Sequence, residues 1–384
     1  MKKKLLIVHN FYREFGGEDA NIKEEIDFFS EKYDIRFFSA DNITKLNLSD
    51  VASFTLRTNL LLNKKFKKEL LDFNPDAVYV HNTWFKINLG IFKILKKYNI
   101  KTIIKIHNFR FDCARYYLSK NHLKGNKICN ACSFEKKKYL IFNKYYEDSL
   151  LKSLLLIFYS KKYFKVIKSN FFKIVSISNF QKSILQNAGI SPSSLTVINN
   201  PISYEGNSET ETKNNYLIYA GRVSKEKGVN ELIDAWIKSK LSEYDLYIIG
   251  EGSQKKVLQE KYKNQNIKFL GRLENKEVLK LIKNAKAVVT ATTLFEGQPR
   301  LLCEASSLKT ISIYPSFGGM DEFFPKNYPF SFKQYNYDDL ILKLNLVLDN
   351  QLMHDSSESV KNFISTKLDS NNINTKFNKL LVGE

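Results

Sequence analysis

Short apolar segments alternate along the chain with longer segments in which apolar residues recur every three or four positions. A short run rich in Val, Ile, Tyr and Phe predicts a strand, and the longer period predicts a helix. Because the two kinds alternate, the pattern predicts βαβ units and parallel sheets. The predicted strands are KLLIVHN, DIRFFSA, DAVYVHN, KTIIKIHN and FKIVSIS in the first half, and YLIYAG, DLYIIGEG, IKFLG, KAVVTA and TISIYPS in the second.

This alternation is interrupted over residues 201–215, where apolar content falls and Gly, Ser, Asn and Glu accumulate. The composition predicts a linker between two Rossmann-like domains, residues 1–200 and residues 216–354. Residues 355–384 are polar with spaced apolar positions and predict one or two terminal helices, whose docking the pattern leaves open. The predicted fold is therefore α/β, with two parallel sheets that face a central cleft, because ligands bind outside the carboxyl ends of such strands.

The length and composition agree with two folded domains. A chain of 384 residues with 43% hydrophobic residues is long enough for two cores. Its net charge of +20 favours anionic partners, which include phosphates, acidic lipids and nucleic acid, without choosing among them. Four cysteines give no disulfide framework, and no apolar run approaches the roughly 18 residues of a membrane span. We expect a cytoplasmic protein, soluble or peripheral at the inner face of the plasma membrane.

Three predicted strands of the first half end in the same dipeptide, His-Asn, at residues 9–10, 81–82 and 107–108. One interpretation is that each pair only caps a strand and satisfies loop backbone groups. The other is that the side chains gather at one edge of the sheet as a functional cluster. Three repetitions in a chain of five histidines favour the second interpretation.

Paired glycines, Gly16 and Gly17, follow the first strand and precede an acidic helix start. Glycines there allow a ligand close to the backbone, and the amino terminus of the helix offers free N–H groups to a phosphate. A simple turn explains the same pair, so this signal is weak by itself.

A second basic loop follows the strand YLIYAG, where Arg222 and Lys227 precede Gly228 and a helix. Two cations and the positive end of a helix converge there, at a predicted strand carboxyl end. A diphosphate fits this arrangement, whereas the plain alternative is a solvated basic loop.

The segment KAVVTATTLFEGQPRLLCEAS predicts a strand, a loop that contains Glu296 and Gly297, and a helix that begins near Pro299. Glu296 lies in the loop, and Glu304 lies about two turns along the helix. A carboxylate accepts hydrogen bonds from two neighbouring hydroxyls. Glu296 is therefore a candidate for binding sugar hydroxyls, and Glu304 for binding a ribose diol.

These motifs together resemble those of the family 4 (group 1) glycosyltransferases, which have the two-domain GT-B architecture and a Glu-x7-Glu motif matched by Glu296 and Glu304. The resemblance covers nearly the whole chain, in the order of the family. It rests on VHNFYREFGGEDA, DAVYVHNTW, IHNFRFDC, SISNFQKSIL, VINNPI, AGRVSKEKG, IIGEGSQ, FEGQPRLLCEA and SFGGMDE.

The resemblance implies a retaining hexosyl-type transferase that moves a sugar from a nucleoside-diphosphate donor to a polysaccharide or lipid-linked oligosaccharide, of the lipopolysaccharide or capsule kind. It implies no cofactor and no metal. The Lys-, Asn- and Ile-rich composition fits a bacterial protein. The implied catalytic residues are His107 and Glu296. The implied donor-binding residues are Gly16, Gly17, Arg222, Lys227, Gly297 and Glu304. Further candidates for donor or acceptor binding are His81, Asn108, Arg300, Gly318 and Gly319.

Arg300 departs from the family pattern, because the position after the proline is usually apolar. An acidic donor sugar would explain it, and so would no functional role at all. Two other functions stay open: a sugar-nucleotide epimerase of the same architecture, and a basic nucleic-acid-binding protein. The epimerase would need acid and base carboxylates at the reacting carbon, and no nucleic-acid-reading motif is present, so we expect no nucleic-acid partner.

Two further segments carry possible binding chemistry. Cys113, Cys129 and Cys132, with His122 between them, have the ligand types of a structural zinc site, although the spacing also suits reduced thiols. Residues 151–172 hold five lysines and no acidic residue among Leu, Ile, Phe and Tyr. Such a segment is typical of a helix that lies on an anionic membrane, and equally of a core helix with a solvated basic face.

Overall fold

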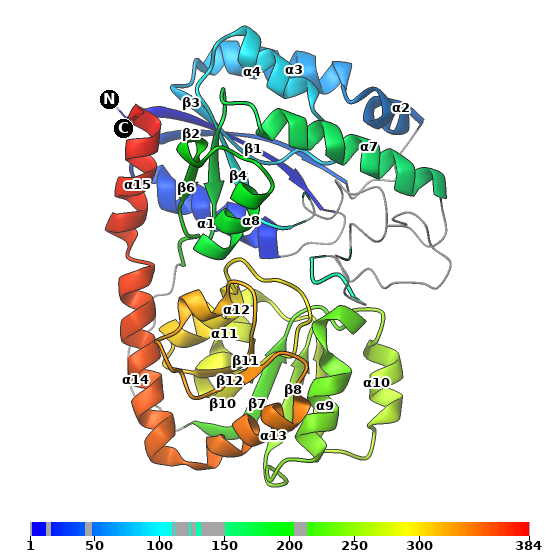
Figure 1. Cartoon of the computed structure of the whole chain (residues 1–384), viewed down its shortest axis with the longest axis vertical. Coiled ribbons are helices and arrows are strands. Elements are labelled where there is room, and N and C mark those ends of the chain that lie inside the picture. Colours follow the sequence, from blue (N-terminus) through cyan, green and yellow to red (C-terminus); the bar gives the residue numbers. More distant parts are fainter. Residues whose placement is uncertain are drawn as a thin grey trace. The chain divides into compact units, whose positions relative to one another are not determined.

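The computed structural model describes residues 2–12, 17–42, 48–109, 111, 123, 128–131, 150–202 and 213–383. The chain forms two compact units (Figure 1). The first unit comprises Met1–Ser203 together with Ser370–Glu384, and the second comprises Tyr204–Asp369. Most of the predicted linker, residues 201–215, lies outside the described residues.

The first unit is built on a six-stranded parallel sheet with the strand order β2-β1-β3-β4-β5-β6. The strands are β1 (Lys4–Phe11), β2 (Asp34–Asp41), β3 (Ala77–Asn82), β4 (Thr102–Ile106), β5 (Lys173–Ser176) and β6 (Leu195–Val197). Its helices are α1 (Gly17–Ser30), α2 (Leu48–Leu56), α3 (Leu60–Phe73), α4 (Gly90–Lys97), α7 (Leu150–Ile167), α8 (Asn179–Asn187), the 3-10 turn η1 (Pro192–Ser194) and α15 (Ser370–Val382).

The central strands of this sheet are apolar on both faces, because helices cover both sides of a parallel sheet. Every residue of β3 and β4 is buried. Polar side chains mark where two of the covering helices begin: Asn59 accepts a hydrogen bond from the N–H of Leu62, and Ser178 accepts one from the N–H of Gln181. These caps satisfy backbone groups that a helix start leaves free.

The second unit repeats the plan, with a six-stranded parallel sheet in the order β12-β11-β10-β7-β8-β9. Its strands are β7 (Asn214–Ala220), β8 (Asp245–Ile249), β9 (Ile267–Gly271), β10 (Ala285–Val289), β11 (Ile311–Ser316) and β12 (Ser331–Lys333). Its helices are η2 (Lys225–Lys227), α9 (Val229–Ile237), α10 (Lys255–Lys261), α11 (Asn275–Asn284), α12 (Arg300–Ser307), η3 (Met320–Phe323), α13 (Tyr337–Asn345), η4 (Leu346–Leu348) and α14 (Asn350–Lys367).

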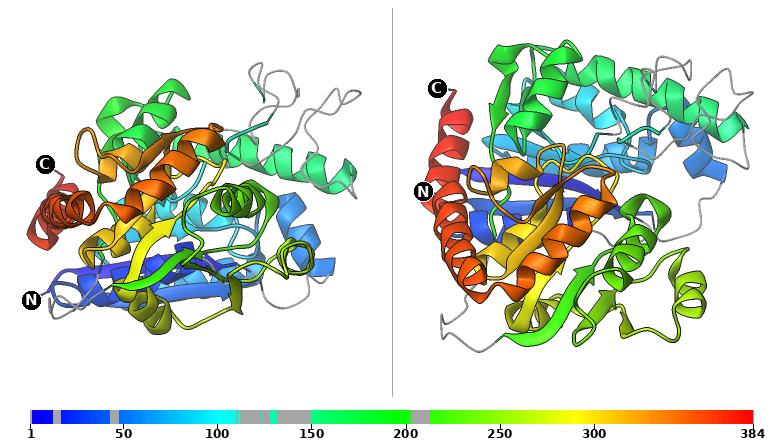
Figure 2. Two further views of the ribbon diagram at one scale, coloured as in Figure 1. Left: turned by 90° about the horizontal axis from the view of Figure 1, so that it is seen from below. Right: turned by 60° about the horizontal axis from the view of Figure 1, so that its bottom comes forward.

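The helices of the second unit pack in two groups. Helix α9 contacts α13, whereas α12 contacts both α11 and α14 (Figure 2). The chain winds outward from β7 through β8 and β9 in one direction and through β10 and β11 in the other. Right-handed crossovers therefore place the helices of the two directions on opposite faces of the sheet. The prediction of two parallel α/β sheets is confirmed in both units.

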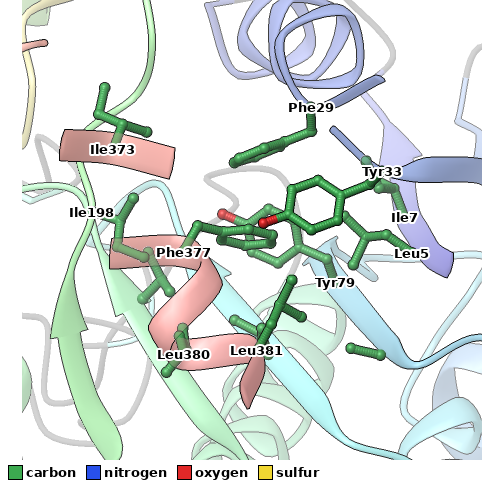
Figure 3. Close-up of a cluster of buried hydrophobic side chains, with 13 residues drawn as sticks. Leu5, Ile7, Phe29, Tyr33, Tyr79, Ile198, Ile373, Phe377, Leu380 and Leu381 are labelled. Atoms are coloured by element: carbon green, nitrogen blue, oxygen red, sulfur yellow. The ribbon is translucent and has the colours of Figure 1, made fainter. Parts of the chain in front are cut away.

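The terminal helix α15 belongs to the first unit, although α14 before it belongs to the second. Phe377 stacks on Phe29 of α1 with ring centroids 4.3 Å apart, and it also contacts Tyr33 and Tyr79. Figure 3 shows this cluster, in which α15 contributes Ile373, Phe377, Leu380 and Leu381. The docking that the sequence pattern left open is therefore set by four apolar side chains on one face of the helix.

Candidate functional site

The carboxyl ends of β1, β3 and β4 bring the predicted histidines of the first unit together. His81 Nδ1 lies 2.8 Å from His107 Nε2, and the two rings stack. The rings of His9 and His81 are 6.4 Å apart, and His9 Nε2 lies 2.9 Å from Asp19 Oδ1 in a buried pair. These three strands are neighbours in the sheet, so the clustering follows from the strand order.

The asparagines of the first two pairs have structural contacts instead. Asn10 Oδ1 accepts hydrogen bonds from the N–H groups of Lys86 and Ile87, and Asn82 Nδ2 donates to the carbonyl oxygen of Asn10. Asn108 differs, because its Nδ2 lies 3.4 Å from Glu18 Oε2 at the edge of a pocket. The interpretation as strand caps therefore holds for Asn10 and Asn82.

An ion pair lies beneath the histidines. Lys105 of β4 donates from Nζ to Glu25 Oε1 of α1 at 2.5 Å, with both side chains fully buried. Glu25 Oε2 is 3.6 Å from His81 Nδ1. Burial raises the pKa of Glu25 and lowers the pKa of Lys105, and each partner opposes the shift of the other.

Burial lowers the pKa of both His81 and His107 well below the usual range, and the charge of Lys105 lowers each further. Both imidazoles are therefore neutral at neutral pH. Glu25, His81 and His107 lie close enough together to suit a metal ion. The ammonium of Lys105 already occupies the carboxylate and would repel a cation, so the cluster fits a hydrogen-bonded chain better than a metal site.

A pocket opens where β1, β3 and β4 end. Its lining includes His81, His107 and Asn108, together with Tyr12, Glu18, Trp84 and Tyr163. Tyr12 donates from its hydroxyl to Glu18 Oε2 at 2.9 Å. A carboxylate beside aromatic rings offers acceptors for hydroxyls and apolar faces for a sugar ring. The sequence pattern did not single out these four residues, because Tyr12, Glu18 and Trp84 each stand alone in a loop or at a helix start, and Tyr163 lies within the apolar helix α7.

Of the predicted glycine pair beside this pocket, Gly16 lies outside the described residues. Gly17 begins α1, and a Cβ added to it would meet no atom within 4 Å. That space is open only as far as the described residues show, and the predicted ligand contact of Gly17 stays a prediction.

In the second unit, the carboxyl ends of β7, β10 and β11 bring three predicted segments together. Lys227 donates from Nζ to Glu296 Oε1 at 2.6 Å. The N–H of Gly319 donates to the carbonyl oxygen of Glu296 at 2.8 Å. Gly318 has a φ of +68°, and a Cβ there would lie 3.3 Å from Glu296 N, so glycine suits this close turn.

The loop that carries Lys227 is held in place by the loop after β10. The N–H of Thr293 donates to the carbonyl oxygen of Glu226 at 2.9 Å. Gly228 begins α9 in the left-handed region, where a Cβ would lie 2.1 Å from the carbonyl oxygen of Ala291. Only glycine fits there, and its missing side chain allows the loop after β7 and the loop after β10 to approach this closely. Arg222 lies in the same loop. Its side chain is 54% exposed, and its Nη2 lies 3.5 Å from Glu226 Oε1.

Helix α12 begins after Pro299, as the sequence predicted, and Gly297 lies buried in the loop before it. Glu304 is buried, and its Oε1 accepts a hydrogen bond from Arg300 Nε at 2.8 Å. This i,i+4 pair explains the unusual arginine in local terms. The charge of Arg300 is compensated within its own helix, which weakens its interpretation as a ligand for an acidic sugar.

The predicted zinc ligands Cys113, Cys132 and His122 lie outside the described residues. Cys129 is described, and its side chain is buried. Within the described ranges, no helix is long and apolar enough to cross a membrane.

The sequence of residues 204–366 matches the model of the family described as glycosyl transferases group 1. Among curated proteins, no sequence matches the chain significantly. The fold is that of solved GT-B structures, and three of them illustrate the likeness.

The first is the apo form of the lipopolysaccharide outer core galactosyltransferase WaaB, with 19% identity, a TM-score of 0.65 and coverage of 99% of both chains. HepE of Anabaena in complex with UDP-glucose has 15% identity and a TM-score of 0.68, over 99% of this chain and 100% of that one. Sucrose-phosphate synthase of Thermosynechococcus elongatus has 10% identity and a TM-score of 0.70, over 99% of this chain and 98% of that one.

Proposed function

We propose that this chain, whose residues 204–366 match the model of the group 1 glycosyl transferases, transfers a hexosyl group from a UDP-sugar to a hydroxyl of a lipid-linked or polysaccharide acceptor, with retention of anomeric configuration. The observation that carries the proposal is the Lys227–Glu296 pair beside the Gly318–Gly319 turn, at the strand ends of the unit that matches the family. Support for the uridine base comes from HepE, which was solved with UDP and with UDP-glucose.

Lys227 and Arg222 are assigned to the donor diphosphate. Lys227 is held by Glu296 and is 22% exposed, so its ammonium can contact an anion without a large rearrangement. The start of α9, beside Lys227, adds a positive dipole. Together they stabilise the charge that grows on the diphosphate as the sugar leaves, and this assignment requires no metal ion or other cofactor.

The reaction balances without an enzyme nucleophile. The bond between the anomeric carbon and the diphosphate oxygen breaks, and its electron pair stays with UDP. The acceptor hydroxyl oxygen forms the new bond on the same face of the sugar, and its proton passes to the departing phosphate oxygen. Glu296 is assigned to the hydroxyls of the sugar, and His107 to its reacting face. A neutral His107 suits that place, because a cation there would oppose the positive charge that develops on the anomeric carbon.

Glu304 is assigned to the ribose diol of the donor nucleotide. It is buried on α12 and oriented by Arg300, which leaves the carboxylate fixed in direction. A carboxylate held in this way loses little side-chain entropy when a diol binds. Arg300 is therefore a residue that positions Glu304, and the donor sugar need not be acidic.

The acceptor side is assigned to the first unit, near an anionic membrane at the inner face of the plasma membrane. Helix α7 exposes Leu150, Leu151 and Phe158 by 51%, 68% and 53%, and Lys161, Lys162 and Lys165 on the same helix are also exposed. Helix α2, which packs on α7 through the stacked rings of Phe54 and Tyr159, exposes Leu56 by 72%. Apolar side chains beside lysines suit the headgroup region of an acidic bilayer.

The test is the release of UDP from UDP-hexoses in the presence of EDTA, with and without lipid-linked saccharide acceptors. We expect UDP release that depends on the acceptor and a product with the donor's anomeric configuration, both visible by NMR. Conversion of the donor to its epimer without UDP release would instead identify an epimerase. Neither release nor epimer from any UDP-sugar would contradict the proposal.

A further inference from the structure

Three buried groups of the first unit, Lys105, Glu25 and His81, form a chain of close contacts that ends at the partly exposed His107. Lys105 Nζ donates to Glu25 Oε1, Glu25 Oε2 is 3.6 Å from His81 Nδ1, and His81 Nδ1 is 2.8 Å from His107 Nε2. The side chains of Lys105, Glu25 and His81 are at most 1% exposed. The chain runs from β4 through α1 and β3 back to the residue that follows β4.

A buried ion pair is by itself weak evidence of a stabilising role. Removing two charges from water costs several kcal/mol per ion, and apolar residues of similar volume often serve equally well in such positions. β4 is otherwise apolar at this depth, with Ile103, Ile104 and Ile106 also buried. A lysine and a glutamate in such a core are therefore expected to serve the group that they contact, which is His81.

The geometry selects one arrangement of protons. His81 Nδ1 lies 3.6 Å from the carboxylate of Glu25 and 2.8 Å from His107 Nε2, a ring nitrogen that donates or accepts according to its tautomer. A carboxylate paired with Lys105 only accepts, so it favours a proton on His81 Nδ1. That proton is donated to His107 Nε2, which must then be unprotonated. His107 consequently carries its own proton on Nδ1.

We propose that Lys105 and Glu25, acting through His81, are positioning residues that fix His107 as the neutral Nδ1–H tautomer, so that His107 donates a hydrogen bond to a substrate oxygen. His107 lines the pocket, and its Nδ1 is buried without a hydrogen-bond partner among the residues that the structure describes. The inference rests on the proposed function, in which His107 faces the reacting sugar.

Other charged groups near His107 do not supply the same effect. His9 of β1 is paired with Asp19 of α1, and its ring contacts His81 rather than hydrogen-bonding to it. Glu18 lines the pocket and is hydrogen-bonded to Tyr12. Lys105 acts on His107 directly only through its positive charge, which adds to burial in lowering the pKa of His107. Glu25 is the one carboxylate in this group that reaches His81 within 4 Å.

The tautomer can be observed directly, because the chain has only five histidines. In protein labelled with 15N-histidine, nitrogen shifts and long-range proton couplings distinguish the two neutral tautomers. We expect His107 of the wild type to be neutral with its proton on Nδ1, from pH 6 to pH 8. A proton on Nε2, or a mixture of tautomers, would overturn the inference.

The decisive variant is Glu25→Leu with Lys105→Met, which removes both charges and preserves volume. We expect it to fold, to show both tautomers of His107, and to lower kcat about tenfold or more while the KM for the donor changes little. The control is Arg36→Met with Glu69→Gln, an exposed ion pair of the same unit with 3.1 Å between its charged atoms, which should change neither readout. An unchanged tautomer and an unchanged kcat in the decisive variant would show that the pair is only structural.

A second variant covers the case in which the double variant does not fold. His81→Phe keeps a ring against Tyr79 and leaves the Lys105–Glu25 pair intact, so it breaks the chain at one link. We expect His107 to show both neutral tautomers in this variant as well. A single Nδ1–H tautomer of His107, as in the wild type, would overturn the inference. If the wild-type tautomer is as proposed but no sugar is transferred, the proposed function fails while the positioning network stands.

Discussion

Lys227 and Glu296 hold opposite charges 2.6 Å apart, and a donor diphosphate would compete with the carboxylate for the same ammonium. The two residues therefore have opposite effects on nucleotide binding. In the proposed function, Lys227 attracts the diphosphate, and Glu296 repels it while binding the sugar.

We predict that Lys227→Ala weakens UDP binding by about 2 kcal/mol, roughly 30-fold in Kd, because it removes a charge-assisted hydrogen bond and leaves Glu296 unpaired. Glu296→Gln should bind UDP at least as tightly as the wild type and yet lose sugar transfer. Calorimetry and initial rates measure both, with Lys238→Ala as a control for an exposed lysine of the same unit. Weaker UDP binding by Glu296→Gln would refute the assigned roles.

The buried histidines make the stability of the first unit depend on pH. The pKa of His81 and of His107 is lowered in the folded state, mainly by burial, whereas the unfolded value is near 6.5. Below that pH the unfolded chain binds more protons, so the free energy of unfolding falls as the pH falls, by up to about 1.4 kcal/mol per group and pH unit.

We therefore predict that the β3 and β4 amides lose protection from hydrogen exchange between pH 7.5 and pH 5.5, after correction for the intrinsic exchange rate. This pH-dependent loss of protection should be smaller in the double variant His81→Phe with His107→Asn. His354→Gln, which alters an exposed histidine of α14, serves as the control. An equal loss in all three proteins would show that these imidazoles are not held neutral.

The repeated His-Asn dipeptide located the histidine cluster from sequence, because neighbouring parallel strands end at the same edge. The partners beneath it were missed, although Lys105 interrupts the apolar run TIIKI and Glu25 lies between Ile22 and Phe29 at helical spacing. Each is a charged residue on a buried face, a signal that points to a partner without identifying it. The Arg300–Glu304 pair was missed as well, because both residues had already been given separate roles.

At the scale of elements, the strand pattern predicted every central strand of both sheets. The two strands that it missed, β6 and β12, have three residues each and lie at sheet edges. Three residues are too few for a period to be recognised, and an edge strand need not be apolar on both faces. The docking of α15 was also beyond the pattern, because its four apolar residues suit any apolar surface.

We predict that Phe377→Ala lowers the free energy of unfolding of the first unit by about 3 to 5 kcal/mol, as expected for a large buried aromatic residue. The ring of Phe377 is fully buried against Phe29, Tyr33 and Tyr79. Denaturation followed by hydrogen exchange of β1 and β3 measures the loss, and Lys376→Ala on the exposed face of α15 is the control. A loss below about 1 kcal/mol would mean that α15 does not stabilise this unit.

For the whole molecule, the net charge of +20 suggests an anionic partner. We propose that the exposed lysines of α7 contact that partner. We predict that the protein sediments with vesicles rich in phosphatidylglycerol at low salt. Lys161→Gln with Lys162→Gln and Lys165→Gln should weaken this binding on the order of 100-fold. The control removes three exposed lysines of the second unit, Lys238, Lys263 and Lys276. Equal binding by the two triple variants would place the membrane contact elsewhere.

The central claim is that the second unit binds a UDP-sugar through Lys227 without a metal ion. Calorimetric titration with UDP, GDP, ADP, dTDP and CMP, each in the presence of EDTA, tests it most directly. We predict that the wild type binds UDP selectively and that Lys227→Ala lowers the affinity for UDP about 30-fold. Binding of none of the five nucleotides, or UDP binding that Lys227→Ala leaves unchanged, would contradict it.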